Sequence, residues 1–214
     1  MGRGRILPPL IYSPVNTSDR CPWAADPPEY RRYHDEEWGR PVTDDGQIFE
    51  KLCLEGFQAG LSWLTILRKR EAFRAAFAGF DAAAVAGFGP DDVTRLLADA
   101  GIVRNRAKIE ATIANARATV ALRDAGESLA ALVWSFEPPA GPAPTGLGDL
   151  AASTPQSKAL SKELLRRGFH FVGPTTVYAA MQSLGIVNDH VAWCFARAEC
   201  EEARAALRRP VGRG

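Results

Sequence analysis

The sequence has almost no excess charge and no long apolar run. Among its 214 residues, 26 lysines and arginines are balanced by 25 acidic residues, so the formal net charge is only +1. Nucleic-acid-binding proteins often have a larger basic excess, so a case for such a partner must come from local basic clusters. No run of about 18 uncharged apolar residues occurs, which argues against a membrane span.

The N-terminal segment lacks the features of a secretion signal. Residues 1–19 contain two arginines, and their apolar part is interrupted by three prolines, whereas a signal peptide needs an uninterrupted apolar stretch. We expect a cytoplasmic protein in which residues 1–19 form a flexible tail. Because only four cysteines occur, metal binding or simple burial is expected for them rather than disulfide formation.

Strand-like alternation is also absent, and the apolar residues follow helical spacing along most of the chain. The pattern predicts an all-α protein. Prolines begin several of the expected helices and glycines follow their ends. Two helices are predicted between 46 and 78, separated at Gly60. Further helices are predicted at 90–100 (ended by Gly101), 105–124, 127–136 and 154–167, and from 174 and about 188 onward, with a proline- and glycine-rich loop at 137–148.

The length allows one large domain or two small lobes. We expect the helices within about 62–150 to form one lobe and residues 20–61 with 151–198 to form the second, followed by a C-terminal tail at 199–214.

Four residues have the side chains of a zinc site. His190 and Cys194 are four residues apart, which places them on one face if the segment is helical. With Cys21 and His34 they make a Cys2His2 set, a complete tetrahedral shell for a structural zinc ion with no open position. The alternative, from spacing alone, is that the cysteines are small buried hydrophobic side chains and the histidines are simply hydrogen-bonded.

A glycine turn followed by basic residues separates two of the predicted helices. In the string AGIVRNRAK, Gly101 is followed by Arg104, Arg106 and Lys108. Backbone N–H groups at such a turn and at a helix start suit a phosphate, and phosphate contacts hold a protein on DNA without reading its sequence. The alternative is a helix-ending glycine followed by a solvated charged face.

An acidic residue occurs in an apolar helical segment. Glu55, in the string LCLEGFQAG, is either solvent-facing or a buried acceptor that needs partners or a raised pKa. Tryptophan and tyrosine faces are what a flipped base stacks upon, although such residues at helical spacing more often belong to a core. The aromatic residues considered with Glu55 are Trp23, Tyr30, Tyr33, Trp38 and Trp63.

Longer strings resemble the 3-methyladenine DNA glycosylase I family. They are RCPWAADPPEYRRYHDEEWG, IFEKLCLEGFQAGLSWLTILRKRE, DAGIVRNRAKI and STPQSKALSKELLRRGFHFVGPTTVYAAMQSLGIVNDH, and the likeness covers about residues 20–195. The resemblance implies a helix-hairpin-helix fold with two helical lobes and a base pocket between them. It also implies a monomeric, monofunctional glycosylase that removes 3-methyladenine from alkylated double-stranded DNA in base excision repair.

The resemblance assigns roles to the residues described above. It implies that Glu55, as the catalytic residue, and Tyr33 hydrogen-bond the adenine edge, while Leu61 fills the gap left in the DNA stack. The implied base pocket consists of Trp23, Tyr30, Tyr33, Glu55, Leu61 and Trp63. The implied ligands of a structural zinc ion are Cys21, His34, His190 and Cys194. The implied DNA-binding residues of the hairpin are Gly101, Arg104, Arg106 and Lys108.

The hairpin lacks a lysine that strand-cutting relatives carry. By the resemblance that position is Asn105, so no amine is present there to form a Schiff base, which favours simple hydrolysis. Two alternatives remain at this point. A non-catalytic helix-hairpin-helix DNA-binding module would not need Glu55 buried among aromatic residues, and a zinc-dependent hydrolase would need three protein ligands and an open metal position.

Overall fold

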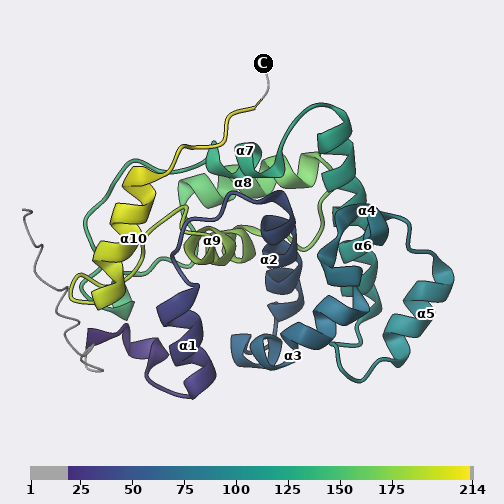
Figure 1. Cartoon of the computed structure of the whole chain (residues 1–214), viewed down its shortest axis with the longest axis horizontal. Helices are drawn as coiled ribbons and strands as arrows, with labels where there is room; N and C mark the ends of the chain where they lie inside the picture. The colour runs from purple at the N-terminus through teal and green to yellow at the C-terminus, as the bar shows by residue number, and fades with distance from the viewer. Residues whose placement is uncertain (1–18, 213–214) are drawn as a thin grey trace, which may run out of the picture.

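Every regular element in the described part of the chain is helical. The computed structural model describes residues 19–212 (Figure 1), so the predicted N-terminal tail lies almost wholly outside it. The helices are α1 (Pro28–Glu36), α2 (Asp45–Gln58), α3 (Trp63–Ala76), α4 (Ala82–Ala86), α5 (Pro90–Ala98), α6 (Arg106–Asp124), α7 (Leu129–Trp134), α8 (Pro155–Arg166), α9 (Pro174–Ser183) and α10 (Phe195–Ala206). The all-α prediction is confirmed, and none of these helices is long and apolar enough to cross a membrane.

Local polar side chains set where the helices begin. The side chains of Asp44, Ser62 and Asn105 accept hydrogen bonds from backbone N–H groups in the first turns of α2, α3 and α6. Such a cap typically contributes about 1 kcal/mol because it satisfies a donor that has no partner within the helix. The predicted break near Gly60 and the predicted start near Asn105 are therefore encoded locally.

Helix α2 is the centre of the main hydrophobic core. It packs against α3, α6, α7 and α9, and Figure 1 shows it in the middle of the molecule between α9 and α6. All residues from Leu52 to Phe57 are buried, so a helix that is apolar on nearly every side is covered on nearly every side. Glu55 lies within this buried stretch.

A second, smaller hydrophobic cluster joins the two ends of the described chain. It consists of Cys21, Tyr33, Trp38, Val191, Cys194 and Ala196. Helices α1 and α10 lie at the same end of the molecule in Figure 1. Trp63, at the start of α3, packs against this cluster and against the main core.

The last helix begins later than the sequence suggested. We expected a start near Asn188, but α10 begins at Phe195. The polar side chains before it are used in other contacts: Asp189 accepts hydrogen bonds from the Tyr178 hydroxyl at 2.6 Å and from Gln182 at 2.8 Å. Asn188 donates to the carbonyl of Arg197 at 3.1 Å. These contacts hold residues 187–194 as a turn rather than as a helix.

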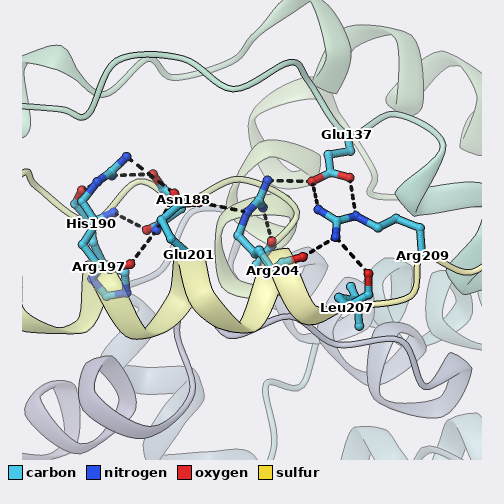
Figure 2. A network of polar contacts seen from close by, with 9 residues as sticks. Glu137, Asn188, His190, Arg197, Glu201, Arg204, Leu207 and Arg209 are labelled. Atoms are coloured by element: carbon cyan, nitrogen blue, oxygen red, sulfur yellow. Dashed lines mark hydrogen bonds and ion pairs between the residues drawn. The ribbon is translucent and has the colours of Figure 1, made fainter.

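The predicted boundary of the C-terminal tail at 199 falls inside α10, which continues to Ala206. Figure 2 shows why the following residues are held against the molecule. Glu137 pairs with Arg204 at 2.7 Å and with Arg209 at 2.8 Å. Because all three side chains are partly buried, the pairs fix residues 204–209 to the segment after α7. The division into two lobes remains a prediction.

Candidate active site

An aromatic cavity of about 360 Å³ lies where the two hydrophobic clusters meet. Five of the six residues expected in the base pocket line it, and Leu61 is the exception. The lining residues are Trp23, Tyr30, Tyr33, Trp38, Glu55, Gln58, Trp63, Leu150, Ala179 and Gln182. The cavity therefore combines aromatic walls with a carboxylate and two amides.

The aromatic side chains hold one another in place. Trp23 packs edge-on against Tyr30 and Trp38, with ring centroids 6.0 and 5.1 Å apart. Tyr33 lies 5.5 Å from Trp63 at an angle of 50°. The Tyr30 hydroxyl accepts a hydrogen bond, at 3.0 Å, from the backbone N–H of the second residue of α3. Edge-on and tilted ring contacts are favourable, so residues from four segments form one rigid wall.

Glu55 is a buried carboxylate that faces this cavity. Glu55 is only 5% exposed, and this burial raises the pKa of its carboxyl group to about 7. Within residues 19–212 it accepts no hydrogen bond. A desolvated carboxylate normally requires partners, so the site is suited to a ligand that brings a donor or a positive charge.

Lys51 does not line the cavity but contacts residues that do, and sequence reasoning missed it. It lies one helical turn before Glu55 on α2, and its charge lowers the pKa of Glu55, against the effect of burial. Its Nζ donates to the Tyr33 hydroxyl at 3.2 Å and lies 4.8 Å from the ring centres of both Tyr33 and Trp63. The four-residue spacing to Glu55 was the available signal, because such pairs face each other on a helix.

The Tyr33 hydroxyl and the Trp63 indole N–H are two hydrogen-bond donors of the aromatic wall. Burial raises the pKa of Tyr33 well above its ordinary value, so its hydroxyl keeps its proton at neutral pH. The indole nitrogen of Trp63 is the one side-chain polar atom in the described part of the chain that is fully shielded from solvent and has no hydrogen-bond partner. A buried donor without a partner is costly, and here it belongs to a residue that lines the cavity.

A buried cluster of potential metal ligands lies directly behind the aromatic wall. The ligand atoms of Cys21, His34, His190 and Cys194 lie within 4.8 Å of one another. Cys194 Sγ is 3.4 Å from His34 Nε2 and 3.5 Å from His190 Nδ1. Tetrahedral zinc bonds of about 2.3 Å to sulfur and 2.05 Å to nitrogen put such atoms about 3.6 Å apart. The four side chains therefore have the spacing of a tetrahedral metal site.

Outer contacts fix which histidine nitrogen faces the cluster. His34 Nδ1 lies 2.8 Å from the Asp35 carboxylate, which Arg20 also binds at 2.8 Å. His190 Nε2 lies 3.1 Å from the carbonyl oxygen of Trp38. Such second contacts orient metal-binding histidines. They leave His34 Nε2 and His190 Nδ1 directed toward the two sulfur atoms.

The prediction that His190 and Cys194 share one face of a helix is wrong. Both lie in the turn before α10, where the Cys194 N–H donates to the carbonyl of Val191 at 2.9 Å. Figure 2 shows Arg197, in the first turn of α10, donating to the carbonyls of Asn188 at 2.9 Å and His190 at 2.7 Å. The turn brings the two ligands together, and Arg197 holds the turn.

The hairpin between α5 and α6, residues 99–105, packs closely on α3. A Cβ on Gly101 would lie 3.0 Å from the Cβ of Ala72 and 2.9 Å from the Asp99 carboxylate, so any larger residue would require these neighbours to shift. The Gly101 N–H donates to that carboxylate at 2.7 Å. Gly101 therefore allows a close approach, and the predicted use of its N–H for a phosphate is not supported.

The basic residues of the hairpin separate into two groups. Arg104 and Arg106 are exposed, as a DNA-binding role requires. Lys108 is only 8% exposed, and its Nζ donates to the carbonyls of Phe57 and Ala59 at the end of α2. The prediction that Lys108 contacts DNA is therefore not supported, because its ammonium group is turned inward.

Leu61 lies outside the cavity, in the loop between α2 and α3. Its side chain is 40% exposed, so it is accessible for insertion into a partner. Two hydrogen bonds join Leu61 to the end of α2: the Leu61 N–H donates to the Gln58 carbonyl at 2.6 Å, and the Gln58 side-chain amide donates to the Leu61 carbonyl at 2.6 Å.

Comparison with known proteins agrees with this geometry. The family model described as methyladenine glycosylase matches residues 23–197. The DNA-3-methyladenine glycosylase 1 of Escherichia coli K12 is 51% identical over 178 residues, 82% of this chain and 95% of that protein.

The chain belongs to the methyladenine glycosylase family.

Two solved structures of that family are similar in fold as well as in sequence. A crystal structure of 3-methyladenine DNA glycosylase I is 50% identical, with a TM-score of 0.81 over 83% of this chain and 99% of that one. A tyrosine-to-phenylalanine variant of 3-methyladenine DNA glycosylase I in complex with 3-methyladenine is 33% identical. Its TM-score is 0.80 over 84% of this chain and 97% of that one. The residues matched by the family model include all those that line the cavity, the hairpin, and three of the four cluster residues; Cys21 lies just before the match.

Proposed function

We propose that this methyladenine glycosylase hydrolyses the N-glycosidic bond of 3-methyladenine in alkylated double-stranded DNA, releasing the free base for base excision repair. The observation that carries the proposal is Glu55, a buried carboxylate without a hydrogen-bond partner in a cavity walled by aromatic rings. The similarity to a protein solved in complex with 3-methyladenine supports the same ligand.

The chemistry of the damaged base explains why such a pocket suffices. Alkylation at N3 gives the base in the nucleotide a positive charge, which weakens its glycosidic bond and makes it a good leaving group. The enzyme has to extrude the nucleotide, at a cost of a few kcal/mol, and to select the charged base. Aromatic faces attract a cation by about 0.5–2 kcal/mol per good contact, whereas neutral adenine gains nothing from that attraction.

In this proposal each pocket residue has a defined task. The ionised Glu55 accepts hydrogen bonds from the adenine edge and adds charge attraction. Tyr33 donates its retained proton, and Trp23 and Trp63 pack on the base. Extrusion excludes bulk water from the cavity, so these contacts strengthen. Water then attacks C1′, and the product is an abasic site.

The metal is proposed to be zinc in a structural role. Cys21, His34, His190 and Cys194 supply four protein ligands at suitable separations. Four protein ligands fill a tetrahedral shell and leave no position for a catalytic water. Zinc would therefore stabilise the join between the two ends of the described chain and support Trp23 and Trp38, which pack on its histidines.

The DNA contacts are proposed to lie on one side of the pocket opening. Arg104 and Arg106 bind phosphates beside the start of α6, and Leu61 enters the gap left by the extruded nucleotide. Asn105 caps α6 with its side chain and offers no amine for a Schiff base, so strand cleavage is not expected. We further propose a cytoplasmic monomer, in keeping with four unpaired cysteines.

The direct test is release of free base from alkylated duplex DNA, separated by chromatography, with strand breaks scored before and after alkali. The proposal predicts free 3-methyladenine and strand breaks only after alkali. If folded, zinc-loaded protein releases no base, a non-catalytic DNA-binding module is the remaining interpretation. If strands break without alkali, the monofunctional assignment is wrong.

A further inference from the structure

Two lysines connect the hairpin with the region around the loop that carries Leu61. One lysine comes from the hairpin side and the other from the side of the loop. The Leu61 loop, residues 59–62, follows α2 and precedes α3. Lys108 reaches from α6, just after the hairpin, to the last residues of α2. Lys69 reaches from α3, just after the Leu61 loop, to the hairpin itself. The helix that follows each segment therefore supplies a lysine to backbone carbonyls in or next to the other segment.

Lys108 binds carbonyl groups that the end of a helix leaves without partners. Its Nζ lies 2.8 Å from the oxygen of Phe57 and 2.6 Å from that of Ala59. The last carbonyls of a helix have no partner within the helix and carry partial negative charge. A lysine offers three donors and accepts nothing, so the buried ammonium is well matched to this position.

Lys69 makes the matching contact on the hairpin. Its Nζ lies 2.9 Å from the carbonyl oxygen of Ala100 and 3.1 Å from that of Gly101. The same stretch of α3 packs so closely against the hairpin that a Cβ on Gly101 would lie only 3.0 Å from the Cβ of Ala72. The hairpin is thus fixed by steric contact and by two hydrogen bonds from one side chain.

The Leu61 loop is also connected to the base pocket, because residues on both sides of it line the cavity. Gln58, which lines the cavity, is joined to Leu61 by two hydrogen bonds of 2.6 Å. Trp63, the first residue of α3, lines the cavity on the other side of the loop. The loop is therefore anchored at both ends to pocket residues, and the lysines anchor those ends to the hairpin.

We propose that Lys108 and Lys69 are positioning residues that make the hairpin, the Leu61 loop and the rim of the base pocket one rigid unit. Phosphates bound at the hairpin then fix how deeply Leu61 enters the DNA and where the extruded base meets the pocket. Neither lysine touches the base or the reacting atoms. The proposal rests on the proposed function, because it assigns parts to base extrusion.

The test compares Lys108→Met and Lys108→Arg with an exposed control, Lys158→Met on α8. The substrate is a duplex with one 3-methyladenine flanked by 2-aminopurine, whose fluorescence rises when the neighbouring base leaves the stack. Free 3-methyladenine binding is followed by quenching of tryptophan fluorescence, and folding by thermal unfolding.

Lys108→Met is expected to lower the single-turnover excision rate at saturating enzyme about ten- to hundredfold, since small misplacements are costly in catalysis. The 2-aminopurine signal should fall with it, while binding of the free base is unchanged. Lys108→Arg, which keeps the donors and the charge, should restore most of the rate. The Lys158→Met control should match the wild type.

Two results would overturn the proposal. One is a wild-type rate and extrusion signal in a folded Lys108→Met protein. The other is equal loss of excision and of free-base binding, which is what a purely structural lysine would give. If Lys108→Met does not fold, the more accessible Lys69→Met is judged by the same criteria. Absence of base release by the wild-type protein would instead defeat the proposed function.

Discussion

The base pocket is held from two sides by different means. Behind the aromatic wall, two cysteines and two histidines from opposite ends of the sequence meet in a metal-ligand cluster. On the side of the hairpin, two lysines donate to four backbone carbonyls. A metal cluster joins segments through a few strong bonds and fails as a unit. Lysine–carbonyl contacts are individually modest and can be removed one at a time.

The comparison predicts that loss of a cluster ligand has the largest effect. Cys194→Ala should abolish stoichiometric zinc binding and unfold the joined ends of the described chain, and base release should be lost with them. The matched control is Cys200→Ala, since Cys200 is buried but lies outside the cluster. Metal content by mass spectrometry and thermal unfolding check this. Zinc retention by the Cys194 variant would show that the ligand set is wrong.

The pH profile should expose the carboxylate of the pocket. Because burial raises the pKa of Glu55 to about 7, the acidic form accumulates below that pH. Excision should fall about tenfold per pH unit once pH lies well below this pKa, in proportion to the ionised fraction. Lys51 lowers the pKa of Glu55, so Lys51→Met should move the fall to higher pH. Single-turnover rates measured across pH test both statements. A Lys51→Met profile that moves to lower pH, or does not move, would contradict the assignment of the fall to Glu55.

Substitution of Gly39, which lies beside the metal-ligand cluster, should have a smaller effect on zinc binding than loss of a ligand. Gly39 has a φ of +79°, and an added Cβ would lie 2.8 Å from His190 Nε2. Gly126 has the same φ with nothing within 4 Å. Both alanine variants should lose about 1 kcal/mol or more of unfolding free energy to backbone strain. Only Gly39→Ala should also weaken zinc binding, measured by competition with a chelator; equal zinc affinities would contradict the proposed site.

The smallest effect is expected from the exposed arginines of the hairpin. Arg104→Gln and Arg106→Gln should each weaken duplex binding and reduce the slope of log K against log salt by about 1. Free-base binding should not change, because neither side chain lines the cavity. Fluorescence anisotropy at several salt concentrations is the measurement. An unchanged slope would mean that the phosphate contacts lie elsewhere.

The metal-ligand cluster and the lysine contacts at the hairpin also differ in how well the sequence predicts them. The zinc ligands were predicted from a resemblance, and the structure gathers them, although the supposed helix face of His190 and Cys194 is a turn. Side-chain hydrogen bonds of Asn188 and Asp189 with distant groups prevent that helix, and spacing alone does not contain this information. Helix starts at capped positions were predicted well because their causes are local.

The lysines show the limit of a motif-based prediction. Lys108 follows two exposed arginines in a basic string, and the family resemblance implied DNA contact for all three, whereas composition alone left a solvated charged face as an equal alternative. Its actual partners, the carbonyls of Phe57 and Ala59, lie 51 and 49 residues away in sequence. Backbone acceptors carry no sequence signature, so only the packing of α6 against α2 reveals them. Lys51 was missed for a related reason, because its partners, Tyr33 and Trp63, come from other helices.

The central claim, that an ionised Glu55 recognises the charged base, is tested most directly by the single-turnover excision rate of Glu55→Gln on a duplex with one 3-methyladenine. The glutamine keeps the shape but removes the charge, so the account predicts a rate about a hundredfold lower. The variant should also be more stable at pH 7 and above, because ionising the buried Glu55 costs folding free energy, and this cost grows between its ordinary pKa of 4.5 and the raised value of about 7. Excision at the wild-type rate would contradict the account.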